Sequence, residues 1–164
     1  MAGLERGPEG ATLRLGADEV DVVASLAEGL AARLADPAPD DQDDPLLDRL
    51  APTASRGDAA LDAELRALLR GDLVSSRVAR LRDLAAGLRG GLEGGVYVRT
   101  LDRGEAMRIV EALNDLRLAL AESIGYEALA RDQPAPDDAR HDVLRLMDAL
   151  AWLQGGLIEY VDGD

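Results

Sequence analysis

Residues 102–124 read DRGEAMRIVEALNDLRLALAESI, and their pattern sets the class of fold. Apolar side chains recur there every three or four residues, which places them on one face of an α helix. Asp102 and Glu105 form the pattern D-x-x-E, a variant of the capping box, whose two side chains bond to free backbone amides at a helix N-terminus. The apolar face consists of Ala106, Ile109, Val110, Leu113, Leu116, Leu120 and Ile124. We therefore expect one long amphipathic helix whose apolar face lies against a core.

The same spacing predicts further helices over 17–34, 58–70, 74–89 and 138–161, with a short apolar turn at 46–50. Gly71 and Asp72 separate the helix ending at 70 from the helix beginning at 74, because glycine is unfavourable inside a helix. Gly155 and Gly156 lie within the last helix, where they mark either a close-packing site or a break. The residues of that helix expected to face inward are Val143, Leu144, Met147, Leu150, Ala151 and Ile158.

Two short segments, 11–15 and 96–100, alternate between apolar and polar residues instead. Alternation with a period of two is typical of a half-buried strand. Because a lone strand leaves its backbone hydrogen bonds unsatisfied, we expect these two segments to pair with each other.

The predicted fold is therefore mainly α, a compact helical domain of four to five helices with a small two-stranded β element. A length of 164 residues suits a single domain spanning 1–164, and 47% hydrophobic residues suffice for a core. Two acidic segments rich in Pro and Asp, at 36–45 and 132–138, are expected to be linker loops.

The chain carries a formal net charge of −14, which repels nucleic-acid phosphates and anionic lipids. Nucleic-acid binding through a basic face is therefore not expected. Solubility is the simpler reading of the charge, and a basic protein partner is the alternative. The sequence has no run of about 18 apolar residues and no signal peptide at its start, so we expect a cytoplasmic protein with no membrane contact.

The sequence offers no familiar catalytic or cofactor motif. It contains no cysteine, which excludes disulfides, zinc thiolate sites and thiol redox chemistry within the chain. It also lacks the glycine-rich phosphate loops, the nucleophile elbow and the HExxH zinc motif. His141 is the single histidine and is expected at the surface, and Asp40, Asp41, Asp43 and Asp44 are expected to be solvated linker rather than a calcium loop. We expect no enzyme activity, no metal and no cofactor.

Several polar residues fall inside or beside the apolar stripes, and they are the candidate site: Arg77, Asn114, Asp115, Arg117 and Gln154. A buried polar group left without a partner costs about 1–3 kcal/mol, so these side chains need partners. One reading is a structural network that joins helices, and the other is a binding site for a group on a partner. We specifically expect Arg117, Asn114 and Gln154 to lie close together.

Trp152 points away from the main stripe of its helix. It either packs against a second neighbour or serves as an exposed anchor for a partner protein.

Residues 112–132 imitate a helix-turn-helix, with a leucine- and alanine-rich helix followed by Gly125. The expected recognition helix, 127–132, is short, acidic at both ends and carries only Arg131 as a base or phosphate contact. Direct DNA binding through this segment is therefore the weaker alternative.

Three segments resemble an actinobacterial family now labelled AosR, for an oxidative-stress transcriptional regulator, and formerly catalogued as a domain of unknown function. They are ALNDLRLAL at 112–120, AWLQ at 151–154 and DPLL…LAP at 44–52. The resemblance implies a regulator without enzyme activity that contacts the transcription machinery, for example a stress sigma factor. Redox sensing of the kind the label describes would need cysteines, which this sequence lacks.

The leading hypothesis is thus a non-enzymatic regulatory or adaptor protein that acts by protein–protein contact. Two alternatives remain: a direct DNA-binding regulator that uses residues 112–132, and an enzyme with an Arg/Asn/acid cleft. A homodimer is compatible with the sequence, because a short β element often gains from an added surface.

Overall fold

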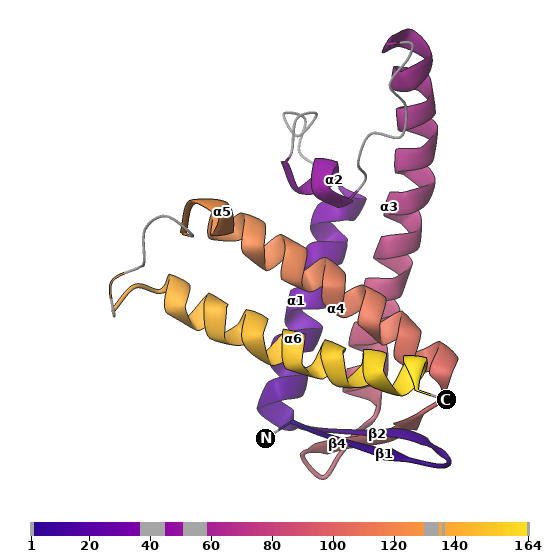
Figure 1. Ribbon diagram of the computed structural model, residues 1–164, viewed down its shortest axis with the longest axis vertical. Coiled ribbons are helices and arrows are strands. Elements are labelled where there is room, and N and C mark those ends of the chain that lie inside the picture. The colour runs from indigo at the N-terminus through magenta and orange to yellow at the C-terminus, as the bar shows by residue number, and fades with distance from the viewer. Residues whose placement is uncertain (1, 37–44, 51–58, 130–134, 136, 164) are drawn as a thin grey trace.

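An antiparallel sheet of four strands, in the order β1-β2-β4-β3, lies across one end of the molecule (Figure 1). The computed structural model describes residues 2–36, 45–50, 59–129, 135 and 137–163. The strands are β1 (Gly3–Gly7), β2 (Gly10–Gly16), β3 (Leu92–Glu93) and β4 (Val96–Leu101). The expected pairing of 11–15 with 96–100 is present as β2 against β4, with Leu15 opposite Tyr97.

The expectation of only a two-stranded β element was wrong, because β2 and β4 are the central strands of a larger sheet. β1 pairs with β2 through a two-residue turn, and Leu4 is its single large apolar residue. β3 is only two residues long. Neither β1 nor β3 shows a clear alternating pattern in the sequence. Each therefore depends on its pairing with the neighbouring strand for its conformation.

Four long helices make up most of the remaining chain: α1 (Ala17–Ala35), α3 (Ala59–Gly90), α4 (Arg103–Ser123) and α6 (Arg140–Asp162). Two short ones, α2 (Pro45–Leu50) and α5 (Tyr126–Leu129), lie between them. The separate helices predicted over 58–70 and 74–89 are one continuous helix, α3, which is a correction to the sequence-based expectation. A single glycine costs a helix only about 1 kcal/mol, so Gly71 does not end it.

The helices form two packed pairs (Figure 1). α1 and α3 lie side by side and run away from the sheet, and α4 and α6 lie side by side and cross them. α6 contacts both β1 and β2, whereas α4 and α1 contact β4. Every long helix therefore lies on the same side of the sheet.

The core lies between the helices and the inner face of the sheet and is built from leucine, valine and alanine. Leu13, Leu15, Tyr97 and Leu101 point into it from the sheet, each with at most 3% of its surface exposed. On the outer face the hydroxyls of Thr12 and Thr100 share a hydrogen bond of 2.9 Å across β2 and β4. One face of the sheet is thus buried and the other is open.

The predicted inward face of α6 is right only in part. Leu150 is buried as expected, but Leu153 and Leu157, which were not predicted, are buried as well, and Ile158, which we expected to face inward, is 38% exposed. The helix is continuous through its glycine pair, so the break is excluded. Gly156 is the close-packing site, because a Cβ there would lie only 2.6 Å from Cδ2 of Leu4 on β1.

None of the helices described is long and apolar enough to cross a membrane. Most of the expected linker 36–45 and more than half of 132–138 lie outside the described residues.

Candidate functional site

An open groove runs between α3 and α4 and continues around the edge of β4. Its inner section has a volume of about 460 Å³ and its outer section about 610 Å³. Gly87, Tyr97 and Arg99 line both sections, so the two adjoin. The inner section is bounded by α3, β4 and α4, and the outer section turns past the end of α3 toward Val98 and Arg14.

One wall of the groove is a strand edge that, from Val98 onward, pairs with no other strand among the described residues. β3 pairs only Leu92 with Tyr97 and Glu93 with Val96. From Val98 to Leu101, no strand in the described part of the chain pairs with this edge of β4. Val98 is 47% exposed, and Arg99 and Thr100 are also exposed, so this edge is accessible.

The local sequence explains why pairing stops there. Gly94 and Gly95, with φ of 58° and 82°, form the two-residue turn between β3 and β4, which needs positive φ at both positions. Gly91 then lies against the ring of Tyr97, where a Cβ would come within 2.7 Å of Cε2. The chain before Gly91 is already helical, so α3 ends where a longer β3 would have continued.

Tyr97 forms the shared floor of the two sections and is only 3% exposed. Burial raises the pKa of its hydroxyl above the ordinary value, and the nearby positive charge of Arg99 opposes that rise. The floor of the groove is therefore a neutral, largely apolar ring.

The walls of the inner section carry charges of both signs. Arg99 of β4 pairs with Glu105, and Nε of Arg80 on α3 lies 3.0 Å from Oε2 of Glu111 on α4. Asp83 and Arg108, on opposite walls, form no ion pair within the residues described. The inner section thus offers one acid and one base, Asp83 and Arg108, that form no ion pair with the described residues, above an apolar floor.

Beside this section lies a buried ion-pair cluster built on Asp115, which is 1% exposed. Arg77 pairs with its Oδ1, and Nη1 of Arg80 lies 3.3 Å from its Oδ2. Nη2 of Arg77 also donates to the carbonyl of Leu50, at 2.8 Å. Burial raises the pKa of Asp115, and the two guanidinium groups offset part of that rise.

The structure brings Arg117 and Gln154 together at the α4–α6 interface but not Asn114. Nη1 of Arg117 donates to Oε1 of Gln154 at 2.6 Å, and Nε2 of Gln154 donates to the carbonyl of Val110 at 3.2 Å. Nε of Arg117 is buried without a hydrogen-bond partner. Asn114 is exposed, on another face of the same helix.

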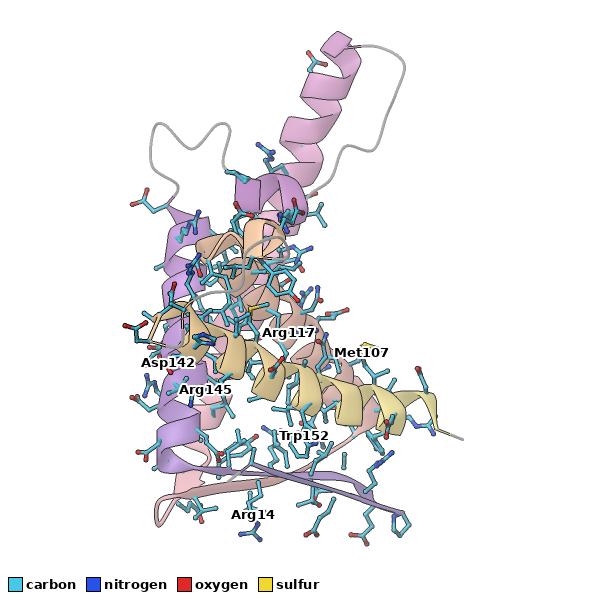
Figure 2. The ribbon with its side chains drawn as sticks, turned by 60° about the vertical axis from the view of Figure 1, so that its left-hand side comes forward. Arg14, Met107, Arg117, Asp142, Arg145 and Trp152 are labelled. Atoms are coloured by element: carbon cyan, nitrogen blue, oxygen red, sulfur yellow. The ribbon has the colours of Figure 1, made fainter. Side chains whose placement is uncertain are left out.

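Trp152 is 56% exposed on α6 (Figure 2), and no hydrogen bond of either polar cluster involves it. His141, expected at the surface, is partly buried, and the acidic residues 40–44 are outside the described part of the chain. The described residues contain no group of three or more side chains arranged to hold a metal ion.

The helix-turn-helix-like segment has a short second helix. α4 ends at Ser123, Gly125 has φ of 59°, and α5 spans only Tyr126–Leu129. The remainder of the expected recognition helix, including Arg131, lies outside the described residues.

Four groove residues were not predicted from the sequence: Arg80, Asp83, Arg99 and Arg108. Arg99 lies two residues from Tyr97 on β4, so the alternation of the strand places both on one face. The side chains on α3 and α4 belong to polar faces of long helices, and only the crossing of those helices brings them together.

No curated protein and no solved structure matches the chain. One family model, described as a domain of unknown function (DUF2017), matches residues 1–161. The chain therefore belongs to the DUF2017 family of domains of unknown function.

Proposed function

We propose that this protein is a non-enzymatic regulatory adaptor that binds an extended segment of another protein in the groove beside β4. The observation that carries the proposal is the unpaired edge of β4 from Val98 to Leu101, which forms one wall of an open groove. An exposed strand edge beside a groove is the geometry used in β-strand addition, where main-chain bonds give affinity and pockets give specificity.

The chemistry of the groove supports an extended polypeptide as the ligand. Alternate side chains of an added strand would point to opposite faces of the sheet. One set would enter the inner section, toward Asp83 and Arg108, and the other would lie over Val98 and Arg14 on the outer face. A basic segment is favoured, because a net charge of −14 steers positively charged partners toward the molecule.

The resemblance to the AosR label extends the proposal to the identity of the partner. On that basis the partner belongs to the transcription machinery, and the regulation belongs to a stress response. Because the chain contains no cysteine, the signal would have to reach it by some means other than its own thiols.

A pair of glycine substitutions tests the groove directly. Gly87 lines both sections, and a Cβ built there meets no atom within 4 Å, so Gly87→Trp directs an indole at the groove with no clash at its Cβ. Gly29 on α1 is equally unobstructed but is not among the residues that line the groove, so Gly29→Trp is the matched control.

The experiment is a crosslinking pulldown with mass spectrometry, followed by titration of the crosslinked partner segment as a synthetic peptide. We expect the wild type and Gly29→Trp to capture the same partner and Gly87→Trp to lose it. Peptide binding should shift the backbone amide resonances of 98–101. A partner that Gly87→Trp still binds, or a peptide that leaves those amides unshifted, would remove the groove from the proposal.

A further inference from the structure

The open edge of β4 presents the backbone groups of two residues, Val98 and Thr100. β3 and β4 are joined by the two-residue turn at 94–95, so the closing residues Glu93 and Val96 exchange hydrogen bonds. The backbone groups of Val96 therefore point toward the edge on which β3 lies. Because successive residues of a strand bond to opposite sides, Val98 and Thr100 point toward that same edge.

The turn between β1 and β2 gives the same assignment independently. β1 and β2 are joined by the two-residue turn at 8–9, so the closing residues Gly7 and Gly10 exchange hydrogen bonds. Alternate residues of β2 bond to β1, and those between them, including Leu13, bond to β4. Leu13 lies opposite Arg99, so the backbone groups of Arg99 are bonded to β2 and are not offered to the open edge.

This alternation defines one central position in an added strand. Every pair of strands in this sheet is antiparallel, and an added segment is taken to pair in the same way. Two of its residues would bond to Val98 and Thr100, and the residue between them would lie opposite Arg99. Directly opposed residues point to the same face of a sheet, so the side chain at this central position enters the inner section of the groove, which Arg99 lines.

Most of the charges in the inner section are already matched. Arg99 pairs with Glu105, so a cation opposite Arg99 would not meet an uncompensated like charge. The guanidinium of Arg80 lies 3.0 Å from Oε2 of Glu111 and 3.3 Å from Oδ2 of Asp115. Asp83 and Arg108 are the two charged lining residues for which the described part of the chain supplies no ion pair.

The surroundings favour Asp83 over Arg108 as the group that a ligand would pair with. Arg108 has a glutamate three residues before it and another three residues after it, Glu105 and Glu111, on the same face of α4. Asp83 has Arg80 three residues before it, but that guanidinium is shared between two carboxylates. The net charge of −14 also makes a bound cation more favourable than a bound anion.

Asp83 can be reached from the edge of the sheet. Gly87, four residues further along α3, lies on the same helix face, and a Cβ built there would meet no atom within 4 Å. One helical turn separates the two residues, about 6 Å along the axis, so a long side chain suits the site. The apolar stem of such a side chain could lie against the ring of Tyr97, which forms the floor.

We infer, on the basis of the strand addition proposed above, that the bound segment carries a lysine or an arginine opposite Arg99, and that Asp83 receives its charge. The main-chain bonds of Val98 and Thr100 hold any extended segment, whereas Asp83 selects among segments by the side chain at one position. Asp83 is thus the residue that determines the specificity of the groove.

The probe is a capped tetrapeptide, valine–threonine–X–threonine, in which X is lysine, norleucine or glutamate. Paired antiparallel, its two threonines lie opposite Thr100 and Val98, and X lies opposite Arg99. Titration followed by NMR of the Val98 and Thr100 amides gives the Kd of each peptide. We expect the lysine peptide to bind about fivefold more tightly than the norleucine peptide, and the glutamate peptide to bind less tightly than either.

A charge reversal separates the contact with Asp83 from the effect of net charge. Asp83 is exposed, so Asp83→Arg leaves the core intact, and it should reverse the preference from the lysine peptide to the glutamate peptide. Asp72→Arg is the matched control, because Asp72 is also exposed on α3 but lines neither section of the groove. It makes the same change in charge and should keep the preference for lysine.

The outcomes distinguish the basic position from the strand addition on which it depends. A lysine peptide that binds wild type no more tightly than the norleucine peptide would overturn the basic position and leave the strand addition standing. So would a lysine preference that Asp83→Arg leaves unchanged, or one that Asp72→Arg removes equally. If none of the three peptides shifts the amides of Val98 and Thr100, the strand addition itself is contradicted, and the basic position with it.

Discussion

Arg77 joins Asp115 to the end of α2: one guanidinium pairs with the carboxylate on α4 and donates to the carbonyl of Leu50, at 2.8 Å. The side chain of Arg77 on α3 thus links that helix to both α4 and α2. The Arg77 side chain is 20% exposed, and the Asp115 side chain is 1% exposed. Replacing either member of such a pair leaves the other buried without compensation.

Asp115→Ala is therefore expected to lower the free energy of unfolding by about 3 kcal/mol or more, as is usual when one partner of a buried pair is removed. Urea denaturation followed by circular dichroism measures the change. Arg80→Gln is the comparison, because Arg80 is the more distant partner of Asp115, at 3.3 Å, and should cost less. If both variants lost the same free energy of unfolding, Arg77 would not be the main partner of Asp115.

Gln154→Ala should lower the free energy of unfolding by about 1–3 kcal/mol, because it leaves the Arg117 guanidinium and the Val110 carbonyl without their partner. Asn114→Ala is the control, since Asn114 is exposed and an exposed substitution usually costs within about 0.5 kcal/mol. The same denaturation experiment reports both. A loss for Asn114→Ala as large as that for Gln154→Ala would show that the two residues act together after all.

Gly91→Ala should destabilise the β3–β4 hairpin. The added Cβ would lie 2.7 Å from Cε2 and 2.9 Å from Cδ2 of Tyr97, so the buried ring would have to move. Overpacking of this kind costs about 1–3 kcal/mol. Gly29→Ala, in an open helical position, should instead stabilise by about 0.5–1 kcal/mol. Melting temperatures that move in opposite directions would confirm this contrast, and a neutral Gly91→Ala would refute it.

Asp138 should titrate well below an ordinary aspartate. The side chain of Arg140 bonds to its carboxylate, and the Arg140 backbone amide donates to it as well, which lowers the pKa of Asp138 to about 2. Any stability from this contact is present above the ordinary pKa of 3.8 and is lost as the pH falls through about 2. Carbon-detected NMR of the side-chain carboxyl measures the midpoint. Arg140→Gln should move it back toward 3.8, and an unchanged midpoint would disprove the assignment.

Sequence reasoning located α1, α4 and α6 and the pairing of β2 with β4, because each carries enough apolar residues to show its period, but it divided α3 into two helices at Gly71. β1 could not be read from GLERG, since Leu4 alone gives no alternation and the strand depends on β2 for every main-chain bond. That omission also hid the contact between Gly156 of α6 and Leu4 of β1, which cannot be foreseen without the strand.

The candidate site was predictable only in part, because the hydrophobic period of one element does not show which distant element it contacts. The hydrogen bond of Arg117 to Gln154 follows from two polar residues placed within apolar stripes, since each needs a partner in the core. The groove depends instead on where α3 ends relative to β4, which is set by the glycine turn and by the crossing of helices distant in sequence. Hydrophobic period carries no information about such a crossing.

The pairing of β2 with β4 joins residues far apart in the chain, as the bond between Thr12 and Thr100 shows, with 88 positions between them. A ribosome adding about 5–20 residues per second needs roughly 4–18 seconds to supply that second strand. Throughout that interval the edge of β2 that later binds β4 has no partner strand, and α6, which contacts β1 and β2, is made only after β4. The nascent protein is therefore exposed to wrong strand pairing at β2 until β4 has been made, and a chaperone that shelters this edge during that interval would improve its yield.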